Sequence, residues 1–234
     1  MGIPIKQGSR TPTSKSPLPL LPVLLLIFIV PLIVEAQLVV PAKYDGFVYK
    51  KRPASTDTII IEAFFDPVCP DSRDAWPPLK TAIHHYPDAS ISLIVHTFPL
   101  PYHDNAFVTS RALHIVNKIN SSATFNLLEI FFNDQERFYG DQTFNTSRAS
   151  VVNQVIQVAA KVVGKKNLSA IRSGFLDSKT DYATRSSFKY GCSRGVYGTP
   201  FFFVNGFPIP DGGSPIDYKK WRSIIDPLVG KNKA

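Results

Sequence analysis

The chain has 234 residues, a formal net charge of +8 and only two cysteines, Cys69 and Cys192. Its basic residues are scattered and no aromatic residues interleave them, so we expect no nucleic acid partner. Two cysteines are too few for a disulfide scaffold, and the five histidines show no Cys/His spacing typical of zinc ligands. We therefore expect no metal site, and we expect each histidine to be a surface or packing residue.

Residues 1–36 have the pattern of a secretory signal peptide. Three basic residues precede an apolar run over residues 18–34, and Val34-Glu35-Ala36 provides a cleavage site before Gln37. The run contains three prolines and is shorter than the roughly 20 residues of a membrane-spanning helix, which argues against an uncleaved anchor. We expect a secreted or extracellular protein without membrane attachment after cleavage, with the endoplasmic reticulum lumen as the alternative location.

Three Asn-x-Ser/Thr sequons follow the signal. Their acceptor residues are Asn120, Asn145 and Asn167. Because a secretory route in a eukaryote makes such sequons accessible to glycosylation, we expect a glycoprotein.

The remaining chain divides into an N-terminal extension (37–57), a main domain (58–229) and a tail (230–234). A short strand is expected in the extension at residues 46–50. In the main domain, residues 59–65 form an apolar run broken only by Glu62, which is typical of a central strand covered on both faces. Pro70 can begin the following helix because the first helical N–H needs no partner, and Pro77-Pro78 should kink or restart that helix before about residue 86.

A second buried strand is expected at residues 91–98. Its connection to the first strand is long enough that the two should be parallel. From about residue 103 to 190 the pattern is helical, with helices expected at 105–117, 123–132, 150–163, 168–175 and 181–190. The last expected elements are a strand at 201–204, a turn at Asn205-Gly206, a short strand at 207–209 and a helix over about 216–228.

Two motifs lie on this framework. The first strand leads into Cys69-Pro-Asp-Ser72, and the strand at 201–204 follows Gly195-Val-Tyr-Gly-Thr199-Pro200. Together with the order βαβ, helical block, ββα, these motifs resemble the DsbA-like family of the thioredoxin superfamily. The resemblance covers about residues 58–229 and includes the junction Thr97-Phe-Pro-Leu-Pro-Tyr-His103. It implies an α/β, thioredoxin-like fold with a helical insertion at about 103–190, between the βαβ and ββα halves.

The resemblance makes Cys69 the nucleophile. A helix start favours a thiolate because unpaired backbone N–H groups and the helix dipole stabilise negative charge. In the family the motif is Cys-x-x-Cys, whereas here Ser72 stands at the fourth position, where it can donate a hydrogen bond to a thiolate but cannot form a disulfide. Between them, Pro70 and Asp71 are the tuning residues, and the carboxylate of Asp71 should oppose the helix effect by like-charge repulsion.

Thr199-Pro200 matches the cis-proline loop of the family. The resemblance implies a cis bond before Pro200, and it implies that the backbone of Thr199 binds an extended peptide beside the active sulfur. The expected partners are therefore extended peptides or proteins that carry thiols or disulfides. No bound cofactor is expected, although glutathione is a candidate co-substrate.

Two further residues have more than one interpretation. Glu62 is either a buried acid beneath the active cysteine that assists proton transfer, or an edge-facing, solvated residue. Cys192 is a buried inert thiol, a disulfide partner of Cys69 or a displaced resolving cysteine; the first is favoured because it lies at a predicted helix end.

The favoured hypothesis is weak thiol-disulfide exchange or isomerase activity by a monothiol site on protein or glutathione disulfides. The alternative is a redox-inactive, thioredoxin-like module that keeps the peptide groove. A kappa-class-like glutathione transferase is less favoured, because that class has serine at the first active position, where this chain has Cys69.

We expect the mature chain to begin at Gln37. N-terminal sequencing of secreted material measures this directly. A chain found in the membrane fraction with residues 18–34 still attached would contradict the expectation.

Overall fold

The computed structural model describes residues 44–49, 58–87, 91–210 and 212–231. The predicted signal peptide, residues 1–36, lies outside the described residues, as does most of the N-terminal extension. No helix among the described residues combines the length and the apolar composition needed to cross a membrane.

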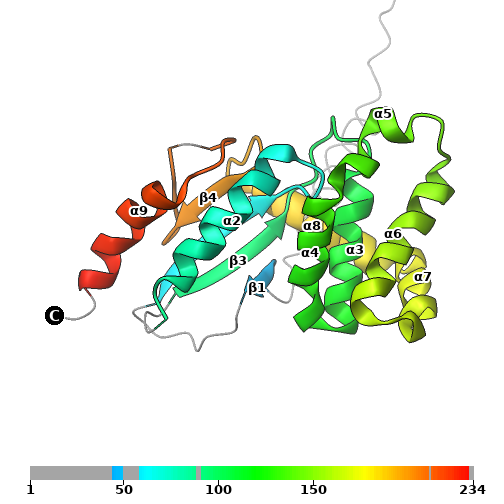
Figure 1. Cartoon of the computed structure of the whole chain (residues 1–234), viewed down its shortest axis with the longest axis horizontal. Coiled ribbons are helices and arrows are strands. Elements are labelled where there is room, and N and C mark those ends of the chain that lie inside the picture. Colours follow the sequence, from blue (N-terminus) through cyan, green and yellow to red (C-terminus); the bar gives the residue numbers. More distant parts are fainter. Residues whose placement is uncertain (1–43, 50–57, 88–90, 211, 232–234) are drawn as a thin grey trace, which may run out of the picture. The chain divides into compact units, whose positions relative to one another are not determined.

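In the part of the chain that the structure describes, five strands form a mixed sheet in the order β1-β3-β2-β4-β5 (Figure 1). They are β1 (Phe47–Tyr49), β2 (Ile59–Phe65), β3 (Ile91–Thr97), β4 (Phe201–Val204) and β5 (Phe207–Pro208). β2 and β3 are parallel, as predicted, and the other neighbouring pairs are antiparallel. Every residue of the central strand β2 except Ile60 is buried, which is why its sequence is apolar without alternation.

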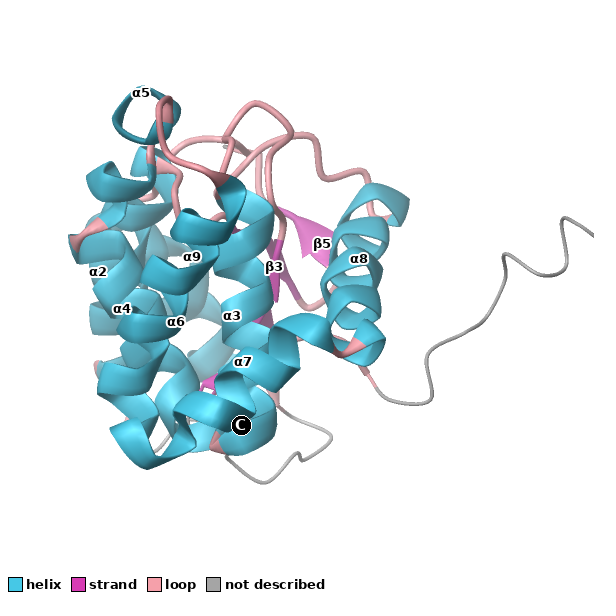
Figure 2. Ribbon diagram, turned by 90° about the vertical axis from the view of Figure 1, so that its right-hand side faces the viewer, coloured by secondary structure: helices cyan, strands magenta, loops and turns pink. Residues whose placement is uncertain are grey.

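Helices cover both faces of this sheet (Figure 2). They are α2 (Pro70–His84) and α9 (Tyr218–Lys231) on one face and α8 (Ser178–Ser193) on the other. Phe65 packs edge-on against Trp76 of α2, whereas its neighbour Phe64 packs against Tyr190 of α8. This difference follows from strand geometry, because successive side chains point to opposite faces.

The segment between β3 and β4 is helical, as predicted, and gathers at one end of the sheet (Figure 1). Its helices are α3 (Ala106–Ile119), α4 (Thr124–Asn133), α5 (Gly140–Thr143), α6 (Arg148–Val163), α7 (Leu168–Leu176) and α8, with 3-10 turns at Ser121–Ala123, Gln135–Phe138 and Lys165–Asn167. The five predicted helices are confirmed, and α5 is an addition. α8 begins earlier than predicted because Asp177 caps it, accepting a hydrogen bond from the Lys179 N–H at 2.9 Å.

Of the two predicted effects of the proline pair in α2, a kink or a restart, the restart does not occur. α2 is one helix in which Pro77 and Pro78 are interior residues. Their missing N–H groups leave the carbonyls of Arg73 and Asp74 without helical partners. Since Asp74 is exposed and Arg73 is half-buried, water can bind these carbonyls and the helix continues.

The C-terminal elements follow local turn and cap chemistry. Asn205 and Gly206 have φ values of 49° and 84°, and they form the predicted turn between β4 and β5. α9 begins at Tyr218, two residues later than predicted, because the side chain of Asp217 accepts a hydrogen bond from the Lys220 N–H at 2.7 Å.

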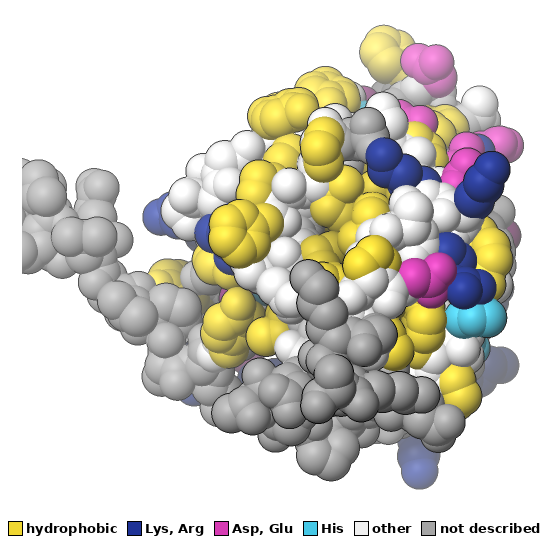
Figure 3. All heavy atoms as spheres, turned by 90° about the vertical axis from the view of Figure 1, so that its left-hand side faces the viewer, with side chains coloured by type: hydrophobic (Ala, Val, Ile, Leu, Met, Phe, Trp, Pro, Cys, Tyr) yellow, Lys and Arg dark blue, Asp and Glu magenta, His cyan; other side chains and the backbone are white. Residues whose placement is uncertain are grey.

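Figure 3 shows the end of the molecule where α9 lies. Basic side chains on this face lie beside acidic ones, with hydrophobic side chains between them. An ion pair of 2.9 Å between Arg222 and Asp226 of α9 is one such neighbour pair. Among the described residues of this face, basic and acidic side chains are thus interspersed.

Candidate functional site

Cys69 lies immediately before α2, as predicted. Its backbone is extended at the N-cap position, and Pro70 is the first helical residue. The thiol is 3% exposed, and its Sγ donates a hydrogen bond to the carbonyl oxygen of Thr199 at 3.3 Å. The Thr199–Pro200 peptide bond is cis, also as predicted. The two sequence motifs therefore meet at one end of the sheet, in direct contact.

Ser72 is fully buried in the first turn of α2. Its Oγ accepts a hydrogen bond from the backbone N–H of Asp66 at 3.3 Å, while the Cys69 thiol donates to Thr199. The predicted hydrogen bond from the Ser72 hydroxyl to the Cys69 sulfur is thus not formed while Cys69 is a protonated thiol. Because the Ser72 oxygen acts as an acceptor here, its own proton is still available, and donation to an ionised Cys69 stays a prediction.

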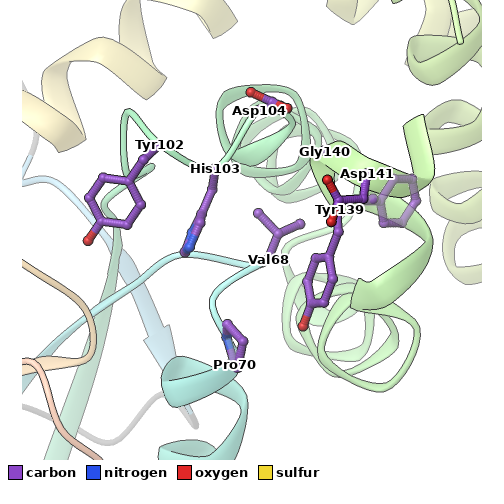
Figure 4. Close-up of a pocket in the computed structure, with 9 residues that line it drawn as sticks. Val68, Pro70, Tyr102, His103, Asp104, Tyr139, Gly140 and Asp141 are labelled. Carbon is purple, nitrogen blue, oxygen red and sulfur yellow. The ribbon is translucent and has the colours of Figure 1, made fainter. Parts of the chain in front are cut away.

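A pocket of about 260 Å³ opens beside Cys69. Its walls include Asp71, Thr199 and two largely exposed tyrosines, Tyr102 and Tyr197. A second pocket of about 340 Å³ shares Pro70, Tyr102 and His103 with the first and continues to Tyr139 and Asp141 in the insert (Figure 4). Together the two pockets line the junction between the active cysteine and the helical insert.

Two residues at this site were missed by the sequence analysis. Asp66 is fully buried, and its carboxylate accepts hydrogen bonds from the backbone N–H groups of Val68 at 2.9 Å and Leu100 at 3.0 Å. Nδ1 of His103 lies 2.8 Å from the same carboxylate. An ionised carboxylate can only accept hydrogen bonds, so His103 donates through Nδ1. Asp66 therefore joins the loop after β2 to the loop after β3.

The sequence held a signal for this pair. Asp66 directly follows β2, and His103 lies in the loop that follows β3. The two strands are parallel neighbours, so their carboxyl ends lie at the same edge of the sheet. Polar residues directly after such strands should meet there, whereas treating each histidine separately concealed the contact.

No family model matches the chain, and no curated protein matches it. Solved structures do match. A candidate protein-disulfide isomerase from Pseudomonas syringae is 19% identical with a TM-score of 0.64, over 77% of this chain and 98% of that one. The catalytic domain of Proteus mirabilis ScsC is 16% identical with a TM-score of 0.57, over 85% and 97% respectively. The thiol-disulfide exchange protein alpha-DsbA2 from Wolbachia pipientis is 16% identical with a TM-score of 0.59, over 78% of this chain and 87% of that one.

The chain has a DsbA-like thioredoxin fold. At these identities the likeness shows the fold alone.

Glu62 lies on β2 and is bound by residues at the end of α8. It lies four residues before Asp66 on β2, about 13 Å along the strand at roughly 3.3 Å per residue. It is buried, and its carboxylate binds Arg194 at 3.1 Å and the hydroxyl of Tyr190 at 2.7 Å. The interpretation of Glu62 as an edge-facing, solvated residue is therefore wrong, because the end of α8 brings a cation onto it, whereas its role in proton transfer beneath Cys69 stays a prediction.

The charge of Glu62 is part of a buried network. Burial alone would raise the pKa of Glu62, but His96, Tyr190 and the charge of Arg194 outweigh it and lower the pKa from 4.5 to about 2. His96 is fully buried, with Nδ1 2.8 Å from Asp45 and Nε2 3.5 Å from Glu62. Burial alone would lower the pKa of His96, yet the two carboxylates raise it. An imidazolium between two carboxylates thus links Asp45, just before β1, to the sheet.

Cys192 is a free, exposed thiol in the last turn of α8, and it forms no disulfide with Cys69. The prediction of a buried thiol is wrong. The buried side of α8 includes Thr184, Ser187 and Gly191, and Cys192 falls beside this stripe. A role as a displaced resolving cysteine stays a prediction.

The three predicted glycosylation acceptors lie at helix ends of the insert. Asn120 and Asn145 are exposed. Asn167 is half-buried, and its amide donates a hydrogen bond to the carbonyl of Val163 at 2.6 Å. Glycosylation stays a prediction, and the first two residues are the more accessible acceptors.

We expect Glu62→Gln to lower the free energy of unfolding at neutral pH by about 3 kcal/mol, since each pKa unit corresponds to roughly 1.4 kcal/mol. The folded-state pKa is depressed, so this stabilisation is present above pH 4.5 and is lost as the pH falls toward about 2. Urea unfolding of parent and variant should therefore give a difference in the free energy of unfolding that narrows as the pH falls from 4.5 to about 2.

The matched control is Glu136→Gln, which changes an exposed carboxylate and should have little effect. A difference between parent and Glu62→Gln that is the same at every pH would contradict the expectation.

Proposed function

We propose that the protein is a secreted monothiol enzyme that exchanges or isomerises disulfides of protein clients or glutathione. The observation that carries this proposal is the contact between Cys69 and the carbonyl of Thr199, with Ser72 in place of a second thiol. The thiol lies at the start of α2, where the helix dipole favours its ionised form. The likeness to thiol-disulfide exchange proteins supports the same chemistry.

The proposed reaction has two exchange steps. In the first, the Cys69 thiolate attacks one sulfur of a client disulfide, so that a Cys69–client S–S bond forms, the client bond breaks and the second client sulfur leaves as a thiolate. Ser72 cannot resolve this mixed disulfide. In the second step another client thiolate, or glutathione, attacks the client sulfur and releases the Cys69 thiolate. Isomerisation by a client thiol involves no net oxidation or reduction.

The client would bind as an extended segment along the Thr199 backbone. Tyr102 and Tyr197 are 70% and 73% exposed and line the pocket beside Cys69. Exposed aromatic rings next to backbone hydrogen-bonding groups suit a peptide whose main chain is bound without strict sequence preference.

One observation favours a second function, a redox-inactive peptide-binding module. The Cys69 thiol is 3% exposed and already hydrogen-bonded, so a disulfide must displace local groups to reach it. Such a module would keep the peptide groove and lose turnover.

Refolding of a scrambled-disulfide client in glutathione buffer tests the choice. We expect Cys69→Ser to reduce the rate to that of buffer alone, because the nucleophile is lost. Cys192→Ser should keep the parent rate because Cys192 forms no disulfide with Cys69, and a loss of rate would assign Cys192 as the displaced resolving cysteine. A parent that binds the unfolded client without accelerating its refolding would establish the binding module instead.

We expect Ser72→Cys to form a disulfide with Cys69 under mild oxidation and to gain oxidase activity, because the mixed disulfide could then be resolved within the protein. Intact mass after alkylation, with and without reduction, measures the bond. Ser72→Ala is the control and should form none. Two alkylatable thiols at positions 69 and 72 after oxidation would show that the site lacks the geometry of a Cys-x-x-Cys helix start.

A further inference from the structure

The pocket beside Cys69 contains a histidine that the exchange steps above leave without a role. His103 lines this pocket together with Cys69, and it also lines the adjoining pocket toward the insert. Its side chain is 23% exposed, so one part of the ring reaches the open space. Figure 4 shows the ring directed at the chain segment just before Val68, which carries its hydrogen-bond partner Asp66.

The orientation of this ring is determined by Asp66. Nδ1 donates to the Asp66 carboxylate at 2.8 Å, and that carboxylate is fully buried and held by two backbone N–H groups. With Nδ1 occupied, Nε2 is the nitrogen of His103 left for exchange of a proton. A nucleophile, a base and a carboxylate that orients the base are the parts that activated nucleophiles require.

We propose that His103 is the catalytic acid and base for exchange at Cys69, and that Asp66 is its positioning residue. This inference rests on the proposed function. His103 supplies what the Cys-Pro-Asp-Ser motif lacks, a group that moves protons to and from the sulfur atoms of the client.

Each proposed exchange step conserves protons within the site and the client. In the resting site the Cys69 proton moves to Nε2 of His103, which gives a thiolate and an imidazolium. When the thiolate attacks the client disulfide, the departing client sulfur takes the proton from Nε2. In the second step neutral His103 removes the proton from the attacking client thiol, and the released Cys69 thiolate again faces an imidazolium. No oxidant or reductant is consumed.

The charges around His103 favour the proposed pair of a Cys69 thiolate and a His103 imidazolium. Among the described residues, the ionisable side chains that line the pockets of His103 are Asp71, Asp104, Asp141, Tyr102, Tyr139, Tyr197, Cys69 and one cation, Arg185, and Asp66 binds His103 directly. Burial, followed by the charges of Cys69, Asp66 and Asp71, raises the pKa of Tyr102. An imidazolium between these groups offsets the repulsion that Asp71 exerts on a thiolate.

The test is the pH dependence of Cys69 alkylation by iodoacetamide, with Cys192→Ser present in every chain so that one thiol reacts. In His103→Asn the amide nitrogen can replace Nδ1 and keep the hydrogen bond to Asp66, while nothing replaces Nε2. We expect the parent to stay reactive in mildly acidic solution. In the variant the rate should fall roughly tenfold per pH unit below the ordinary thiol pKa of about 8.5.

His85→Asn, which changes an exposed histidine beyond the end of α2, is the matched control and should keep the parent profile. Asp66→Asn keeps the shape and removes the charge, and we expect its profile to lie between those of the parent and His103→Asn. This second variant tests the proposal independently if His103→Asn does not fold.

Identical profiles in the parent, His103→Asn and Asp66→Asn would overturn the proposal, as would a lowered melting temperature with an unchanged profile, which is what a purely structural role predicts. The refolding assay separates this outcome from failure of the proposed function. A His103-dependent profile without client turnover refutes the enzyme and supports the pair. Full turnover in His103→Asn refutes the role of His103 and leaves the enzyme.

Discussion

The hydrogen bonds of one residue, Asp66, determine the geometry of the site. Its backbone carbonyl accepts from the Cys69 N–H at 3.1 Å, and its backbone N–H donates to Ser72. Its carboxylate binds the loop after β3 through Leu100 and His103. A buried carboxylate is costly unless each oxygen has partners, and here both oxygens have them. The same bonds that offset the cost of burying the charge therefore position Cys69, the start of α2 and His103.

The two faces of the sheet contribute differently to this arrangement. The face under α2 and α9 is apolar, and it fixes the position of α2 through contacts such as Phe65 with Trp76. The face under α8 carries the polar network of Glu62, His96 and Arg194. Cys69 belongs with Phe64 to the smaller apolar cluster on this second face, so the network lies further along the same side of the sheet.

The sequence allowed the fold to be predicted because its main signals are local. An unbroken apolar run gave β2, and turn residues gave the β4–β5 hairpin, without knowledge of distant contacts. The pairing of Cys69 with Thr199 came from the resemblance, which relates segments 130 residues apart. The roles of Asp66 and Glu62 could not be found in this way. Each depends on a partner far along the chain, His103 for Asp66 and Arg194 for Glu62. These contacts depend on the register of β2 with β3 and on where α8 crosses the sheet, which local sequence patterns do not give.

The hydrogen bond from Cys69 to Thr199 links activation to client binding in the proposed mechanism. While the thiol is protonated, it donates to the Thr199 carbonyl, the group that an extended client would use as an acceptor. Ionisation removes that proton, so the sulfur becomes a nucleophile at the moment when the carbonyl becomes free for a client N–H. In a dithiol motif the second thiol would compete with the client for a disulfide bond to Cys69. The hydroxyl of Ser72 cannot form such a bond. In the proposed mechanism, the hydrogen bond from the Cys69 thiol to the Thr199 carbonyl therefore forms again when the client leaves and Cys69 regains its proton.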